Sequence, residues 1–207
     1  MPNTPKRRRP VVEDVWNIPN ALTMARVVVI PGFLWLLHQA TREYCFWAAI
    51  VFTLAAITDA LDGYLARRMG IESVFGKLLD PLADKLIVMA SLVWMVPMGR
   101  IEPAVVVLLL AREFGITSLR SVAASEGMVI AAGQDGKMKT ALQMIGIICL
   151  IAGHPYRLQY FGIDCGVCDL VHVGKLLVYS SLVFSLVSAL SYGRLFARAI
   201  DARDENA

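Results

Sequence analysis

Four aspartates in an unusually apolar chain have the types and spacing that chemistry requires. They are Asp59, Asp62, Asp80 and Asp84. Side chains three or four residues apart share one face of a helix, so the first two converge on one helix and the last two on another. A carboxylate at the centre of a bilayer-spanning helix costs about 2.5–3.5 kcal/mol, so four of them need a compensating positive charge.

Divalent metal ions are the expected source of that charge. Four carboxylates match two divalent cations, and an all-oxygen ligand set without nearby Cys or His favours Mg²⁺, Mn²⁺ or Ca²⁺ over Zn²⁺. On one unbroken helix, Asp62 and Asp80 would lie about 27 Å apart at 1.5 Å per residue. Gly70 and the basic residues before it instead predict a chain reversal, which lets two antiparallel helices present all four carboxylates to one volume.

Composition predicts the elements that position these residues. The chain has 207 residues, of which 57% are hydrophobic and 18% charged, which is more apolar than one soluble core needs. We therefore expect an all-α polytopic membrane protein with about six transmembrane helices of about 20 residues each. The apolar stretches are 21–40, 44–65, 75–98, 103–124, 138–153 and 170–191. The expected organisation is a basic juxtamembrane segment 1–19, a six-span domain 20–195 and a polar tail 196–207.

Basic residues predict the orientation of the chain. Arg42, Arg100 and Arg157 fall in segments on one side of the expected bilayer, and most other Lys and Arg residues fall on the opposite side. The positive-inside rule then puts both termini and the aspartates on the cytoplasmic side. We interpret the run Lys6–Arg9 as a contact with anionic lipid headgroups. No aromatic-rich basic face accompanies that run, so we expect no nucleic-acid partner.

The aspartates belong to a longer pattern, Asp-x₂-Asp-Gly-x₂-Ala-Arg-x₈-Gly-x₃-Asp-x₃-Asp, which covers residues 59–84. In this pattern the chain resembles the CDP-alcohol phosphotransferase family at every specified position. The resemblance implies that an alcohol attacks the β-phosphorus of a CDP-linked lipid and that CMP leaves. It also implies a multi-pass enzyme of the bacterial inner membrane, commonly a homodimer.

The resemblance also implies roles for the motif residues. Asp59, Asp62 and Asp80 are the principal ligands of two Mg or Mn ions, with Asp84 on the second ion. Asp84 is also the expected general base, because a carboxylate beside the acceptor hydroxyl can take its proton. The cytidine and diphosphate of the donor would lie against Asp62, Gly63, Ala66, Arg67 and Gly76. The alternative for the small residues is close packing between helices in lipid.

Three further stretches resemble the phosphatidylglycerophosphate synthases of that family. They are Asn17–Arg26, Ala111–Glu113 and Gly136–Thr140. Basic groups in and near them suit an acceptor that carries its own phosphate, such as glycerol 3-phosphate, and would repel cationic choline or ethanolamine. These groups are Arg112, Lys137, Lys139, Arg120 and Arg26. The alternative for Arg112 is a structural pair with an acidic neighbour.

Other functions remain open from the sequence. Within the family, the acceptor alcohol could be inositol phosphate, serine or phosphatidylglycerol in place of glycerol 3-phosphate. In another class, intramembrane carboxylates also line the paths of divalent-cation transporters, although a transporter has no use for a nucleotide site. Cys165 and Cys168 in the expected outer loop are compatible with a disulfide or a zinc site, and a lone Cys-x-x-Cys does not decide between them.

Overall fold

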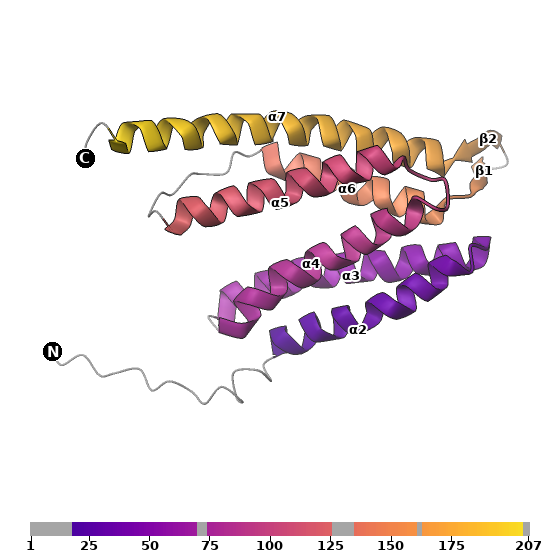
Figure 1. Ribbon diagram of the computed structural model, residues 1–207. Helices are drawn as coiled ribbons and strands as arrows, with labels where there is room; N and C mark the ends of the chain where they lie inside the picture. The colour runs from indigo at the N-terminus through magenta and orange to yellow at the C-terminus, as the bar shows by residue number, and fades with distance from the viewer. Residues whose placement is uncertain (1–17, 70–73, 126–134, 161–162, 205–207) are drawn as a thin grey trace. The chain divides into compact units, whose positions relative to one another are not determined.

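The computed structural model describes residues 18–69, 74–125, 135–160 and 163–204, and their side chains over 24–59, 85–125, 139–156 and 167–197. Six helices and one antiparallel hairpin make up these residues (Figure 1). The helices are α2 (Ile18–His38), α3 (Arg42–Met69), α4 (Val74–Met95), α5 (Pro103–Ser125), α6 (Asp135–Ala152) and α7 (Leu170–Asp204). The hairpin strands are β1 (Pro155–Tyr160) and β2 (Ile163–Asp169).

The predicted helical architecture is confirmed, because each of the six apolar stretches coincides with one helix. Two features differ from the prediction. The segment between α6 and α7 forms a hairpin, where aromatic and β-branched residues such as Tyr156 and Val167 suit a strand. Helix α7 continues to Asp204 and so includes most of the expected tail, since Ala and Arg in that tail favour helix.

Two compact units divide the chain, Met1–Ala90 and Ser91–Ala207. In the first unit, α2 packs against α3. Phe33 and Phe52 meet at the centre of this interface, with ring centroids 6.2 Å apart. Leu37 and Cys45 are fully buried towards the connection between the helices, so Cys45 packs as a small apolar side chain.

In the second unit, α6 and α7 pack closely around two glycines. A Cβ on Gly174 would lie 2.8 Å from the backbone oxygen of Gly146, and a Cβ on Gly146 would lie 2.8 Å from a methyl carbon of Val178. The helix backbones can therefore approach each other only because both residues lack a side chain.

Arg100 joins the connection between α4 and α5 to the end of α6. Its side chain is buried, and its Nη1 donates hydrogen bonds to the backbone oxygens of Leu150 at 2.9 Å and Ile151 at 2.6 Å. The last carbonyls of a helix have no intrahelical donor, so Arg100 satisfies two of them. Gly153 follows with φ +49°, and a Cβ there would overlap the guanidinium of Arg100.

Ion pairs also fix the beginnings of α5 and α7. Lys175 donates a 2.8 Å hydrogen bond to Glu102, and this bond lowers the pKa of Glu102 below its ordinary value. The Asp169 carboxylate accepts a hydrogen bond from the Val171 N–H and pairs with His172, which chiefly accounts for the lowered pKa of Asp169. Because both pKa values are depressed, both contacts stabilise the fold above the carboxylates' unfolded pKa values and weaken as pH falls through the folded ones.

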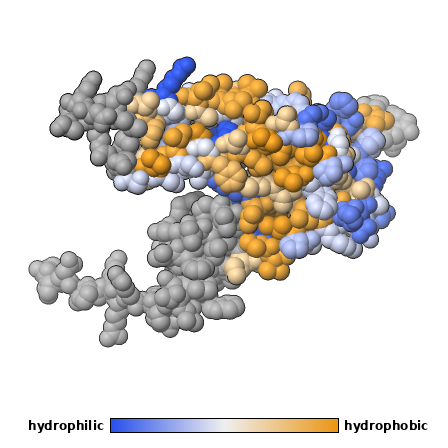
Figure 2. All heavy atoms as spheres, in the orientation of Figure 1, coloured by the Kyte–Doolittle hydropathy of each residue, from blue (hydrophilic) through white to orange (hydrophobic). Residues whose placement is uncertain are grey.

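Apolar side chains cover the outer face of α7 (Figure 2). Leu176, Val183, Val187 and Leu190 recur at helical spacing and are each about 60% exposed or more. Among the described residues, α7 is the one helix that is long and apolar enough to cross a bilayer, through Leu170–Ala197. Shorter apolar helices in that part of the chain are Met24–His38, Lys85–Met95 and Lys139–Ala152.

The glycine contact between α6 and α7 yields a stability prediction. We expect Gly174→Ala to destabilise the protein by about 1–3 kcal/mol, because the new methyl group meets backbone atoms that cannot rotate away. The matched control is Gly193→Ala on the same helix, where a Cβ meets nothing within 4 Å. We expect the control to stabilise by up to about 1 kcal/mol, because alanine favours a helix over glycine. Thermal unfolding in detergent measures both, and equal midpoints would contradict the prediction.

Candidate active site

An ion pair between α2 and α3 lies at the start of the aspartate motif. Arg26 Nη1 is 2.8 Å from Asp59 Oδ1. Arg26 comes seven residues before Phe33, and Asp59 comes seven residues after Phe52. Seven residues are about two helical turns, so the ion pair forms the next layer of the same interface as the two phenylalanines.

The two partners of this pair differ in their access to solvent. The Arg26 side chain is 4% exposed and the Asp59 side chain is 37% exposed. A buried guanidinium without a partner costs several kcal/mol, so the Asp59 carboxylate compensates a charge that the apolar interface would otherwise exclude. Asp59 itself remains open enough to accept a further ligand.

The rest of the motif follows on α3 and α4. Asp62, Gly63, Ala66 and Arg67 continue α3, whereas Gly76, Asp80 and Asp84 belong to α4. Their side chains lie outside the described residues. Helix α3 ends at Met69 and α4 begins at Val74 and runs back in the opposite direction (Figure 1). The predicted reversal between the two pairs of aspartates is therefore confirmed at the level of the backbone.

The donor set of the motif fits a hard divalent cation. All four candidate ligands are carboxylates. The described one, Asp59, is partly exposed, and its Oδ1 pairs with the guanidinium of Arg26. Within the residues whose side chains are described, no group of three or more His, Cys, Asp or Glu side chains occurs. The side chains of the other three aspartates lie outside the described residues, so the metal site stays a prediction.

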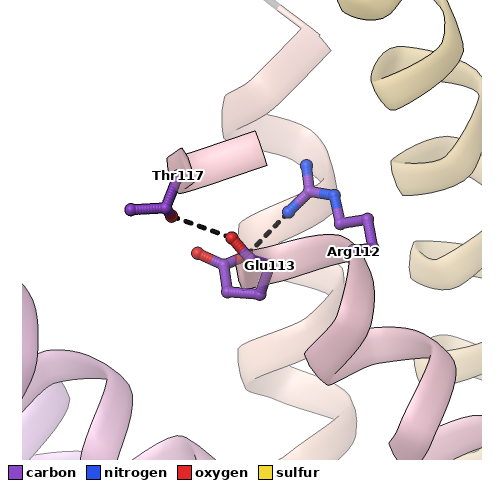
Figure 3. A network of polar contacts seen from close by, with 3 residues as sticks. All are labelled: Arg112, Glu113 and Thr117. Atoms are coloured by element: carbon purple, nitrogen blue, oxygen red, sulfur yellow. Dashed lines mark hydrogen bonds and ion pairs between the residues drawn. The ribbon is translucent and has the colours of Figure 1, made fainter. Parts of the chain in front are cut away.

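A further arginine, whose side chain is largely shielded from solvent, lies in the middle of α5 (Figure 3). Arg112 Nη1 is 2.7 Å from Glu113 Oε2, and the Arg112 side chain is only 8% exposed. The Nε atom of Arg112 is buried and has no hydrogen-bond partner in the part of the chain that the structure describes. Thr117 Oγ1 donates a 2.8 Å hydrogen bond to the Glu113 backbone oxygen. The pairing with an acidic neighbour is thus present, and within the described residues it leaves the buried Nε donor without a partner.

The other predicted basic residues of the second unit lie on α5 and α6. Arg120 is exposed on α5, two turns after Arg112, and Lys139 is half-buried on α6. Lys137 belongs to the first turn of α6, and its side chain lies outside the described residues. Cys168 carries a free thiol on β2, and the Cys165 side chain is outside the described residues.

Sequence reasoning assigned Arg26 to the acceptor phosphate and missed its contact with Asp59. A signal for that contact was present in the spacing. Arg26, Phe33 and Leu37 share one face of α2, as Cys45, Phe52 and Asp59 share one face of α3. A basic residue on one apolar face and an acidic residue on the facing one predict a pair, provided that the register of the two helices is known.

Comparison with known proteins identifies the family. A family model described as CDP-alcohol phosphatidyltransferase matches residues 16–187. The CDP-diacylglycerol–glycerol-3-phosphate 3-phosphatidyltransferase of Bacillus subtilis is 36% identical over 160 residues, which cover 71% of this chain and 83% of the relative. The protein of the same name from Rickettsia typhi is 32% identical over 176 residues, covering 85% and 94%.

A third relative agrees with these two. The probable phosphatidylglycerophosphate synthase of Mycobacterium tuberculosis is 39% identical over 136 residues, which cover 63% of this chain and 64% of the relative. The region matched by the family model includes the whole aspartate motif, the Arg26–Asp59 pair and the buried Arg112. The chain therefore belongs to the CDP-alcohol phosphatidyltransferase family.

Proposed function

We propose that this protein transfers the phosphatidyl group of CDP-diacylglycerol to glycerol 3-phosphate, giving phosphatidylglycerol phosphate and CMP. The observation that carries the proposal is the complete aspartate motif within a region that matches the family model. The relatives from Bacillus and Rickettsia are named for this reaction, which supports glycerol 3-phosphate as the acceptor.

The carboxylates of the motif would hold the metal. The family is generally dependent on divalent cations. In our proposal, Asp59, Asp62, Asp80 and Asp84 hold two Mg or Mn ions, which supply positive charge to the diphosphate and to the departing CMP when they are bound. The acceptor hydroxyl oxygen forms the new bond to the β-phosphorus, the bond to CMP breaks, and the Asp84 carboxylate takes the hydroxyl proton.

The remaining motif residues would bind the donor. Gly63, Ala66 and Gly76 lack bulky side chains, which permits the cytidine and diphosphate to approach the helix backbones closely. Arg67, one residue after Ala66, would contact phosphate. Asp62 would both bind the metal and contact the CDP-diacylglycerol donor.

Arg112 is the strongest candidate for the acceptor phosphate. It is a buried cation with one carboxylate partner and an Nε donor without a partner, so an incoming phosphate would complete its hydrogen bonds. Lys137, Lys139 and Arg120 would add positive charge around the same anion. Glycerol 3-phosphate brings a phosphate to such a site, whereas a cationic alcohol would be repelled.

We propose that the protein is a multi-pass enzyme of the cytoplasmic membrane. The apolar, exposed face of α7 supports contact with lipid, and the six helices coincide with six apolar stretches. The distribution of basic residues supports both termini and the active site on the cytoplasmic side. We also propose that the protein assembles as a homodimer. The proposed catalytic domain covers residues 20–195, between a juxtamembrane segment 1–19 and a tail 196–207.

One assay tests the reaction. Purified protein is incubated with CDP-diacylglycerol in mixed micelles and with one alcohol at a time, and CMP release is measured. We expect release with glycerol 3-phosphate and far less with inositol phosphate, serine or phosphatidylglycerol. Faster release with another alcohol would overturn the acceptor, and no release with any of them would overturn the phosphatidyltransferase proposal.

The metal requirement yields a prediction. A chelator should abolish CMP release, and Mg²⁺ or Mn²⁺ should restore it. Asp80→Asn should lower turnover by more than the roughly ten- to a hundredfold that loss of an outer partner of a metal ligand costs, while circular dichroism shows the fold retained. Ser191→Ala is the matched control, because Ser191 is exposed on α7 and bonds only to the Val187 backbone oxygen within its own helix. Full activity in metal-free buffer would contradict the metal site.

The role of Asp84 yields a second prediction. If Asp84 takes the proton as well as contacting metal, Asp84→Asn should depress turnover while CDP-diacylglycerol still binds in the presence of metal. Equilibrium binding of a CDP-lipid measures the donor affinity. A loss of donor affinity as large as that of Asp59→Asn would show that Asp84 acts chiefly as a ligand.

The role of Arg112 yields a third prediction. Hydrogen bonds to an ionised partner contribute about 1.5–3 kcal/mol each, so Arg112→Ala should raise the KM for glycerol 3-phosphate about ten- to a hundredfold. The KM for CDP-diacylglycerol should change far less. Arg112→Lys should recover only part of the loss, because an ammonium group cannot donate two parallel hydrogen bonds as a guanidinium does. Equal losses for both substrates would move Arg112 out of the acceptor site.

A further inference from the structure

We propose that Arg26 is a positioning residue for Asp59: it holds one oxygen of the carboxylate and thereby presents the other to the divalent cation. The inference rests on the proposed metal site. Arg26 Nη1 lies 2.8 Å from Asp59 Oδ1. A carboxylate has two oxygens with about four lone-pair positions, so Asp59 retains capacity for a metal while Arg26 stays in place.

Helix packing fixes the position of Arg26. The layer formed by Phe33 and Phe52 sets the register of α2 against α3, and Arg26 and Asp59 form the layer two turns further along the same interface. The Arg26 side chain is 4% exposed, so its conformation is determined by the packed helices around it. A guanidinium held in this way orients a partner more firmly than an exposed side chain does.

The contrast with Arg112 separates this role from phosphate binding. Arg112 pairs with the adjacent residue of its own helix and keeps a buried Nε without a partner. Arg26 instead pairs with a carboxylate from a different helix, and that carboxylate is the first residue of the aspartate motif. An incoming phosphate at Arg26 would have to displace Asp59, whereas a phosphate at Arg112 would fill an open donor.

The positive charge of Arg26 has two opposite effects on a bound cation. It repels the cation through space, and it holds the ligand oxygen in place. Outer partners of metal ligands typically contribute ten- to a hundredfold in metal affinity. Because Asp59 is one of four carboxylates in the proposed site, their combined negative charge outweighs one guanidinium, and we expect the positioning effect to prevail.

The test measures Mn²⁺ binding to the full chain in detergent by electron paramagnetic resonance, which does not depend on catalysis. We expect Arg26→Gln to weaken Mn²⁺ binding about ten- to a hundredfold and Arg26→Lys to weaken it less. The control is Arg42→Gln, which removes the same charge from an exposed residue at the start of α3 and should leave binding unchanged. In the Asp59→Asn background, Arg26→Gln should cause a much smaller further loss of Mn²⁺ affinity, because the proposed effect of Arg26 on the metal passes through its contact with Asp59.

Turnover provides a second readout. The Mg²⁺ concentration that gives half-maximal CMP release should rise in Arg26→Gln by about the same factor as the Mn²⁺ dissociation constant. Saturating Mg²⁺ should restore most of the turnover, which a general disruption of the fold would not permit. If Arg26→Gln does not fold, Arg26→Lys decides the question, because it keeps the charge and changes only the geometry.

Several results would overturn the proposal. Unchanged or tighter Mn²⁺ binding in folded Arg26→Gln or Arg26→Lys would show that Arg26 does not position a metal ligand. An unmodified chain that binds no Mn²⁺ would overturn the metal site and this role together. A different acceptor alcohol in the CMP-release assay would change the proposed function alone and leave the Mn²⁺ result intact, so the two failures are distinguishable.

Discussion

Charge buried among apolar helices must be compensated, and three arginines meet this constraint in three different ways. Arg26 pairs with a carboxylate from the facing helix, Arg100 donates to two backbone oxygens at the end of α6, and Arg112 pairs with its own neighbour. Burial of an unpaired ion is strongly unfavourable, so each solution restricts how the surrounding helices can pack. The solutions also differ in completeness, because among the described residues the buried Nε of Arg112 has no hydrogen-bond partner.

The two compact units are assembled on different physical principles. In the first unit, a layer of two phenylalanine rings lies next to a layer formed by an ion pair between α2 and α3. In the second unit, glycines bring α6 and α7 into near-direct backbone contact. Layers of large side chains fix a register, which suits helices that must hold a carboxylate in one orientation. Close contact between backbones increases the van der Waals attraction between two helices. This attraction matters in lipid, because the hydrophobic effect does not drive apolar helices together there.

Much of the fold and part of the site were predictable from the sequence. Apolar length alone located all six helices, and an arginine deep in an apolar run, followed by Glu113, indicated the pair on α5. The partner of Arg26 was not predictable, because it depends on the register between α2 and α3, and periodicity within one helix carries no information about register. The hairpin was missed for a related reason: its two strands pair with each other, and that pairing is not visible in the pattern of either strand alone.

The length of α7 has a consequence for how the ends of the molecule are coupled. At 1.5 Å per residue, its 35 residues extend about 52 Å, whereas the hydrocarbon core of a bilayer is about 30 Å thick. Asp169 caps the first turn beside the hairpin, and Arg194 and Arg198 lie near the other end. In the proposed membrane-spanning arrangement, the depth of the hairpin on one side of the bilayer would set the height of these basic residues above the opposite surface, because one continuous helix joins them. A change in bilayer thickness would then tilt the whole of α7 and displace both of its ends together.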